Sequence, residues 1–319
     1  MIVRAAKVCA LLLAAFALGC SDGGSSSAPD APLPVDSVQS EVRTLVDGTR
    51  TTPAKPGFAG AADRTLATRL WYAPEAPRSS ACGRHGCALV VLAHGFGGST
   101  MRFDAYGRYL AARGYVVAAP SFPLTNDQAP GGSSTGLPDL VSQPGDVSFV
   151  IDQMLAASAD PADVLHDRVD GARIGVMGHS LGGATVAALT RLDCCTDPRV
   201  GAVIAVAPAM YVIDLFASGA VRAAGPPTLS LTGDLDTAVP SHFVRTFFDG
   251  IDPPRIYVQL VGATHVNLIE NYGDPSPLLV PTEEASAAFL ASYLSGDDGD
   301  LAPTFDALAG AGETVDADY

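Results

Sequence analysis

The serine at the centre of Gly178-His-Ser-Leu-Gly-Gly183 has the pattern Gly-x-Ser-x-Gly around it. Before this segment, Arg173 to Met177 form an apolar run that is typical of a buried strand, and after it Leu181 to Leu192 form a helix-like pattern. A serine between a strand and a helix lies on a tight turn that exposes its hydroxyl, and the glycines give the strand and helix room to approach. We therefore predict that Ser180 is a nucleophile.

A serine hydroxyl becomes a good nucleophile only when a base is within reach and a carboxylate orients that base. Two histidines follow Ser180 in the chain. His265 lies just past an apolar run that ends at Val261, which is where a base on a loop is expected, whereas His242 lies at the start of an expected helix. The sequence therefore predicts His265 as the base.

The acid is expected in the turn after the preceding strand, Thr228 to Leu231. Asp234 and Asp236 both lie in this turn. Asp236 is deeper in the turn, while Asp234 is well placed to cap it. Asp236 is the preferred acid, and the family resemblance given below supports that choice.

A carbonyl group attacked by serine develops negative charge on its oxygen, which two fixed backbone N–H groups can stabilise. One N–H group is expected from Leu181, the residue after the nucleophile. The other is expected from the loop His94-Gly-Phe-Gly-Gly98, which follows the apolar run Ala88 to Ala93. We assign this second role to the Phe96 N–H group. His94 is expected to hold the loop, and His179 to line the turn, so neither is predicted as the base.

Strand-like apolar runs alternate with helix-like patterns along most of the chain. Strands are expected over residues 88–93, 115–119, 173–177, 200–207, 228–231 and 256–261. Helices are expected over 103–113, 143–157, 181–192 and 282–294, with one more between the last two strands. This alternation predicts an α/β fold with a mainly parallel central sheet flanked by helices, with antiparallel strands added from residues 41–75, notably 66–72. The connection from 207 to 228 is short, so no large lid is expected.

Several segments of the chain resemble the serine esterases of the α/β-hydrolase superfamily, over about residues 41–295. They are residues 65–72, 94–98, 114–120, 146–150 and 178–183, which are most similar to predicted dienelactone-hydrolase, chlorophyllase-like and platelet-activating-factor-acetylhydrolase-like proteins. Residues 234–240 and 262–265 are similar to bacterial cutinases and polyester hydrolases. The resemblance implies a triad of Ser180, Asp236 and His265, with the amides of Phe96 and Leu181 as the oxyanion hole. Ala207-Pro-Ala-Met210 lacks the Trp of polyester hydrolases, and no Cys pair follows Cys195.

The resemblance and the predicted triad imply a serine carboxylic-ester hydrolase that forms an acyl-enzyme on short-to-medium acyl esters. No cofactor and no metal are implied. A lipase or phospholipase and a polyester hydrolase are alternatives within the same chemistry. An inactive hydrolase-fold binding lipoprotein is the alternative from another class. We expect the protein to be a monomer.

The charge of the chain argues against nucleic acid as a partner. Its 319 residues include 34 acidic and 19 basic side chains, giving a formal net charge of −15. Phosphate binding needs clustered Lys and Arg, which this sequence lacks. Hydrophobic residues make up 48% of the chain, enough to bury a large core.

Residues 1–19 resemble a bacterial lipoprotein signal peptide. Arg4 and Lys7 precede the apolar stretch Val8 to Leu18, which is too short to span a bilayer, and Cys20 follows as the predicted lipidation site. An ordinary signal peptide with an incidental cysteine is the alternative. Residues 20–40 are rich in Ser, Gly and Pro and are predicted to form a flexible tether. We expect an exported protein, anchored by lipid to the bacterial envelope at the outer membrane.

The membrane is therefore expected to be contacted through this anchor only. Cleavage after residue 19 removes Arg4 and Lys7 and no acid, which changes the net charge from −15 to −17. Anionic headgroups repel such a surface.

Four further cysteines, Cys82, Cys87, Cys194 and Cys195, are an even number in an oxidising compartment. They are predicted to form disulfides, with three pairings possible, and metal binding is the weaker alternative. Residues 296–319 contain seven acids and no base, and are predicted to form a solvated acidic tail. Calcium binding by Asp297-Asp-Gly-Asp300 is the weaker alternative there.

Overall fold

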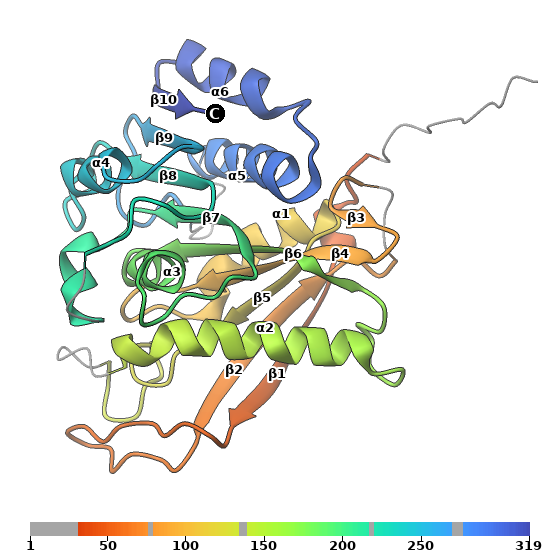
Figure 1. Cartoon of the computed structure of the whole chain (residues 1–319), viewed down its shortest axis with the longest axis vertical. Helices are drawn as coiled ribbons and strands as arrows, with labels where there is room; N and C mark the ends of the chain where they lie inside the picture. Colours follow the sequence, from red (N-terminus) through yellow and green to blue (C-terminus); the bar gives the residue numbers. More distant parts are fainter. Residues whose placement is uncertain (1–30, 76–78, 134–138, 217–219, 270–276) are drawn as a thin grey trace, which may run out of the picture.

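The computed structural model describes residues 31–75, 79–133, 139–216, 220–269 and 277–319. Ten strands of the described chain form one sheet with helices on both faces (Figure 1). The strands are β1 (Gln39–Asp47), β2 (Arg64–Tyr72), β3 (Cys82–Gly83), β4 (Gly86–Ala93), β5 (Val116–Pro120), β6 (Val169–His179), β7 (Val200–Val206), β8 (Thr228–Gly233), β9 (Arg255–Leu260) and β10 (Thr314–Asp318).

The sheet order is β1-β2-β5-β4-β6-β7-β8-β9-β10, and β3 pairs with β4 as a short hairpin. Pairing is parallel from β5 to β9 and antiparallel at β1–β2, β2–β5 and β9–β10. The middle strands are continuous apolar runs because helices cover both of their faces. The predicted α/β fold with antiparallel strands added before residue 75 is confirmed.

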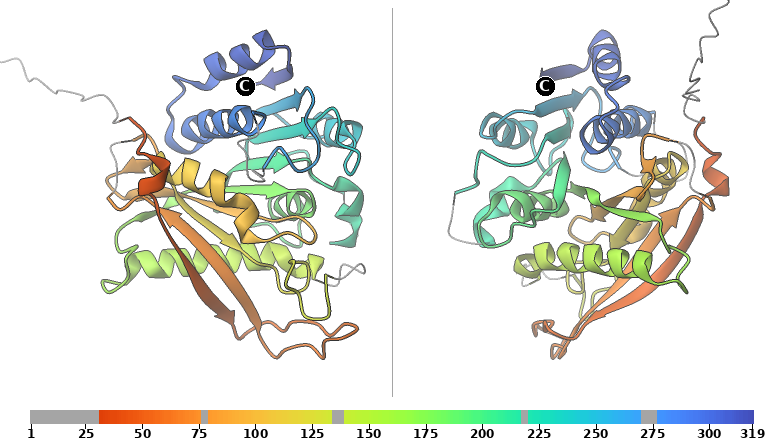
Figure 2. Two further views of the ribbon diagram at one scale, coloured as in Figure 1. Left: turned by 180° about the vertical axis from the view of Figure 1, so that it is seen from behind. Right: turned by 45° about the vertical axis from the view of Figure 1, so that its right-hand side comes forward.

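The helices form a layer on each side of this sheet (Figures 1 and 2). On one face lie α1 (Asp104–Ala112) and α5 (Leu279–Ser295), and on the other α2 (Gln143–Ala159), α3 (Leu181–Arg191) and α4 (Ser241–Asp249). Helix α6 (Leu301–Gly310) packs on α5 and β10. Short 3-10 helices are η1 (Val35–Ser37), η2 (Thr100–Phe103), η3 (Leu140–Ser142) and η4 (Met210–Leu215).

Helix α2 shows why the sequence folds in this way. Val147, Val150, Ile151 and Met154 recur at helical spacing and are all fully buried against the sheet. Burial of each such side chain contributes about 1.5–3 kcal/mol. This apolar stripe fixes the position of α2 beside α3, which begins just after the predicted nucleophile.

The predicted tether ends earlier than residue 40. Strand β1 begins at Gln39, the Leu33 N–H group donates to the Ala112 carbonyl at 2.9 Å, and the Leu33 side chain packs on the core. Residues 1–30, including the predicted lipidation site Cys20, lie outside the described residues.

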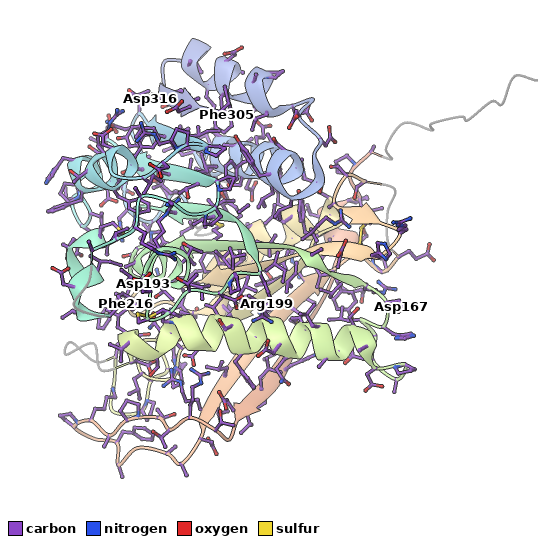
Figure 3. All side chains as sticks on the ribbon, in the orientation of Figure 1. Asp167, Asp193, Arg199, Phe216, Phe305 and Asp316 are labelled. Atoms are coloured by element: carbon purple, nitrogen blue, oxygen red, sulfur yellow. A yellow bond between two sulfur atoms is a disulfide. The ribbon has the colours of Figure 1, made fainter. Side chains whose placement is uncertain are left out.

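The prediction of a solvated acidic tail over residues 296–319 is wrong. These residues form α6 and β10, and β10 pairs with β9 at the edge of the sheet. Leu301, Phe305 and Leu308 are buried in the core, while acids such as Asp316 of β10 remain partly exposed (Figure 3). The apolar residues of α6 recur at helical spacing, which outweighs the acidic composition of the segment.

Two disulfides form among the described residues, as expected for an oxidising compartment. Cys82 pairs with Cys87 across the β3–β4 hairpin, and Cys194 pairs with its neighbour Cys195 just after α3. The sequence left the pairing open, and the structure resolves it.

The described residues between β7 and β8 form only η4 and irregular chain, consistent with a fold that has no large lid. Within the described ranges, no helix is both long enough and apolar enough to cross a membrane. No group of three or more potential metal-ligating side chains occurs in this part of the chain either.

Candidate active site

The turn between β6 and α3 holds Ser180 in a backbone conformation that residues other than glycine rarely adopt, with φ of 56° and ψ of −117°. Two hydrogen bonds fix this conformation. The Ser180 N–H group donates to the Val206 carbonyl at 2.9 Å, and the Ser180 carbonyl accepts from the Ala209 N–H group at 2.9 Å. A non-glycine residue at positive φ is strained, and such strain persists at functional turns where the surrounding structure holds it.

The glycines of the motif are required by close packing. A Cβ atom on Gly178 would overlap the Gly182 carbonyl, and one on Gly182 would overlap the Ala93 carbonyl. A Cβ on Gly95 would lie 2.9 Å from the Ser180 Cβ, so the loop after β4 passes directly beside the predicted nucleophile. The sequence expectation that these glycines permit a close strand–helix approach is therefore confirmed.

The loops after β8 and β9 bring together the predicted acid and the predicted base. His265 Nδ1 and Asp236 Oδ2 are 2.7 Å apart. The Asp236 side chain is fully buried, whereas the His265 side chain is 19% exposed. A histidine whose Nδ1–H group is held by a buried carboxylate keeps Nε2 free to accept a proton.

Asp236 is held as a carboxylate. Burial alone would raise its pKa, but hydrogen bonds from His265 and from the Val239 and Ala238 N–H groups outweigh that effect, so the pKa of Asp236 is lowered. The two backbone N–H groups donate to Asp236 Oδ1 at 2.8 and 2.9 Å. The other oxygen is therefore the one that is free to orient the histidine.

His179 has a larger role than lining the turn. Its Nε2–H group donates to the His265 carbonyl at 2.8 Å, and the two rings lie 4.5 Å apart. Burial, with a smaller effect from nearby His265, lowers the pKa of His179 to about 3, so this ring stays neutral. The residue before the nucleophile thus fixes the backbone of the predicted base, a contact that no local pattern in the sequence reveals.

The two residues that competed with these assignments lie elsewhere. Asp234 Oδ1 accepts a hydrogen bond from the Gly262 N–H group at 2.6 Å, so this carboxylate ties the loop after β8 to the loop after β9. His242 lies exposed at the start of α4, with its ring 4.2 Å from that of Phe243. Neither Asp234 nor His242 therefore takes part in the hydrogen bond between the predicted acid and the predicted base.

The loop after β4 is held from within and from the segment that follows β5. Buried His94 donates from Nδ1 to the Gly95 carbonyl at 2.8 Å and accepts at Nε2 from the Phe122 N–H group at 2.9 Å. Burial lowers the pKa of His94 to about 4, which keeps the ring neutral for both contacts. The Gly97 N–H group also donates to the Thr125 carbonyl at 2.7 Å. His94 thus holds the loop, as expected.

The predicted oxyanion donors are available to a ligand. Within the described residues, neither the Phe96 nor the Leu181 N–H group donates to a protein acceptor. Leu181 begins α3, where the first N–H groups of a helix have no intrahelical partner. A negatively charged oxygen beside Ser180 is a suitable acceptor for both.

The apolar residues near the site divide into two groups. Phe96 is 44% exposed and Tyr211 is 57% exposed, and the Tyr211 ring contacts that of Phe243 at 5.7 Å. Phe216 is buried in the core. Phe96 and Tyr211 are therefore available to contact an acyl group, whereas Phe216 serves packing.

A family model described as the alpha/beta hydrolase family matches residues 90–318, which is more than half of the chain. The chain therefore belongs to the alpha/beta hydrolase family. A solved structure of a ferulic acid esterase from Streptomyces cinnamoneus has the same fold, with a TM-score of 0.63 at 22% identity. That match covers 85% of this chain and 94% of the esterase.

Curated relatives are ester hydrolases. The chain is 28% identical over 274 residues to a bis(hydroxyethyl) terephthalate hydrolase of Streptomyces coelicolor, covering 82% of this chain and 76% of the relative. It is 28% identical over 179 residues to cutinase est1 of Thermobifida alba, covering 55% of this chain and about half, 52%, of the cutinase. The class expected from the sequence, a serine carboxylic-ester hydrolase, is confirmed by these comparisons.

Proposed function

We propose that this protein hydrolyses short-to-medium acyl esters, with Ser180 as nucleophile, His265 as base and Asp236 as the acid that orients the base. The observation that most supports these roles is the 2.7 Å hydrogen bond between His265 and buried Asp236. The backbone of His265 is joined to the strained Ser180 turn through His179, the residue before Ser180. The Phe96 and Leu181 N–H groups complete the site as the oxyanion hole.

The proposed reaction has two halves. Ser180 Oγ attacks the ester carbonyl while His265 Nε2 takes the hydroxyl proton, and the tetrahedral oxyanion accepts hydrogen bonds from the two N–H groups. Collapse expels the alcohol, which receives the proton from His265, and leaves an acyl group on Ser180. Water activated by His265 then releases the acid and regenerates the serine.

The test uses residues 21–319, which include every described element, with p-nitrophenyl esters from acetate to palmitate as substrates. We expect turnover on acetate to octanoate. Ser180→Ala should lower kcat by about 10⁶-fold, leaving only the residual rate that the oxyanion hole and substrate binding provide. Turnover that is unchanged in Ser180→Ala would refute the assignment of the nucleophile. A preference for palmitate would favour a lipase or phospholipase instead.

A second candidate substrate is a terephthalate ester. It is favoured by the exposed rings of Phe96 and Tyr211 and by the names of the relatives, one of which is a bis(hydroxyethyl) terephthalate hydrolase. Release of mono(hydroxyethyl) terephthalate from the soluble diester would support this candidate. Turnover of aliphatic esters with none of the diester would restrict the protein to aliphatic acyl groups.

We further propose that Cys20 is lipidated and anchors the protein to the outer membrane of a bacterial envelope. The support is the sequence of residues 1–20 and the Ser-, Gly- and Pro-rich stretch that follows. In a Gram-negative host fed radioactive palmitate, the full chain should be labelled and Cys20→Ala should not. Equal labelling of both would contradict the anchor, and no labelling of either would indicate an ordinary signal peptide.

A further inference from the structure

The two proposed oxyanion donors belong to different parts of the fold. Phe96 lies on the loop after β4, and Leu181 begins α3. Both N–H groups must point at one oxygen, so their spacing must be set by contacts that join the loop to the helix. A displacement of about 1 Å at such a site costs about 10²-fold in rate.

A fully buried glutamine makes such a connection. Gln143, the first residue of α2, donates from Nε2 to the Thr125 hydroxyl at 2.8 Å. Its Oε1 atom accepts from the Thr185 hydroxyl at 2.6 Å. Thr125 and Thr185 are fully buried too, so water does not compete for these hydrogen bonds.

Each threonine is connected to one of the proposed donors. The Thr125 carbonyl accepts from Gly97, the residue after Phe96, at 2.7 Å. The Thr185 hydroxyl lies 3.1 Å from the Leu181 carbonyl, one turn earlier in α3. Helices α2 and α3 pack against each other on the same face of the sheet, as Figures 1 and 2 show.

The far side of Thr125 is held as well. The fully buried Asp139 carboxylate accepts from the Leu124 N–H group at 2.7 Å and forms a 2.9 Å ion pair with Arg64. The segment around Thr125 is therefore fixed at its backbone, and Gln143 transmits that fixed position to α3.

We infer that Gln143 is a positioning residue, which sets the distance and angle between the Phe96 and Leu181 N–H groups through Thr125 and Thr185. The inference rests on the proposed ester hydrolysis. It assigns Gln143 no contact with the substrate. Its effect is therefore expected on stabilisation of the transition state and not on binding of the ester.

The test measures kcat, KM and the inhibition constant of an alkylboronic acid for Gln143→Leu, Thr125→Val, Thr185→Val and the double threonine variant. The boron atom forms a bond with Ser180 Oγ, whose proton passes to His265 Nε2, and becomes tetrahedral, so one of its own oxygens occupies the oxyanion hole. We expect each single variant to lower kcat by about 10–100-fold and to raise the boronate constant by a similar factor. KM should change less than about threefold.

Non-additivity gives the sharpest readout. Breaking the chain of hydrogen bonds at either threonine removes the same connection, so the double variant should be no slower than the slower single variant. Thr190→Val is the matched control, because Thr190 is also buried on α3 and its hydroxyl donates within the helix to the Val186 carbonyl at 2.8 Å. It should lower the melting temperature without raising the boronate constant.

The outcomes separate the two proposals. Unchanged kcat in the two threonine variants, additive losses in the double variant, or an equal effect of Thr190→Val would each overturn the role of Gln143. Thr125→Val and Thr185→Val conserve shape, so they keep the test decisive if Gln143→Leu fails to fold. A wild-type protein without Ser180-dependent turnover would instead overturn the proposed function itself.

Discussion

Two regions of this molecule hold a buried carboxylate, and they differ in the cation or base beside it. In the loop after β8, Asp236 is paired with His265, which remains partly exposed. At the start of α2, Asp146 is paired with Arg64, and both side chains are fully buried. Histidine gains and loses a proton near neutral pH, whereas arginine stays charged. The first pair is therefore suited to moving a proton, and the second only to holding chain segments together.

The largest effect should come from the first region. Asp236→Asn keeps the shape of the side chain but removes the charge that orients and stabilises protonated His265, so kcat should fall by about 10²–10⁴-fold. The measurement is steady-state hydrolysis of p-nitrophenyl butyrate. A loss of less than about tenfold would mean that Asp236 is not the acid of the triad.

The second region should respond in stability instead. Asp146→Asn removes one of the two carboxylates that pair with buried Arg64, the other being Asp139, and should lower the free energy of unfolding by about 1–3 kcal/mol. In the folded protein, kcat should change by less than about tenfold, because Asp146 makes no contact with the site residues. Urea unfolding and ester hydrolysis on the same preparation test this contrast. A large fall in kcat without loss of stability would place Asp146 in the catalytic machinery.

A third carboxylate shows what burial does without a close cation. Glu283 in α5 is 8% exposed, and within the described residues it has no salt bridge. Burial raises its pKa to about 7, against a smaller opposing effect of Arg113. The folded state therefore binds the proton more tightly than the unfolded state, so stability is full below the ordinary pKa of 4.5 and is lost as the pH rises towards about 7.

The variant Glu283→Gln should not show this loss of stability with rising pH, because glutamine carries no titratable proton. Relative to wild type, the variant should gain about 2–3 kcal/mol in unfolding free energy between about pH 5 and about pH 8. Urea unfolding at about pH 5 and about pH 8 measures the gain. Glu284→Gln removes an exposed neighbouring charge that makes a smaller contribution to the raised pKa of Glu283, so this control should show a much weaker dependence. The same difference between wild type and Glu283→Gln at both pH values would contradict the raised pKa.

The smallest effect is expected at Asp234, which is two residues from the proposed acid. An asparagine oxygen can still accept from the Gly262 N–H group, so Asp234→Asn should keep kcat within about tenfold. Measuring kcat of Asp234→Asn and Asp236→Asn under the same conditions tests whether these two nearby acids have different roles. If the two losses were exchanged, the triad would contain Asp234.

The parts of the site that were predictable are local in sequence. A strand, a tight turn with glycines and a helix are all encoded between Arg173 and Leu192, so this element could be placed without a structure. The choice between Asp234 and Asp236 depends on the loop after β9, because Asp234 contacts Gly262 in this loop and Asp236 contacts His265. The choice of Asp236 therefore rested on its place in the turn and on family resemblance.

The features that could not be predicted from the sequence depend on contacts between distant segments of the chain. The sequence of β10 is mostly acidic and polar, which does not indicate a strand. The segment forms a strand because it pairs with β9, which lies more than fifty residues earlier. In the sequence, Gln143 has the pattern of an ordinary first residue of a helix. Its role depends on two hydrogen bonds to residues that lie on other elements. The disulfide pairing was also open, since the cysteine positions alone allow three arrangements.

The position of β10 has a consequence for the order in which the enzyme is completed. Translation proceeds from the N-terminus, so β9 is available before its partner strand β10. In the folded chain, Glu313, just before β10, accepts from the Val261 N–H group at the start of the loop that ends in His265. A nascent chain that already contains Ser180, Asp236 and His265 therefore leaves the edge of β9 open, in addition to that of β1, and has a less restrained base. Ribosome-stalled or C-terminally truncated chains are where premature aggregation should begin.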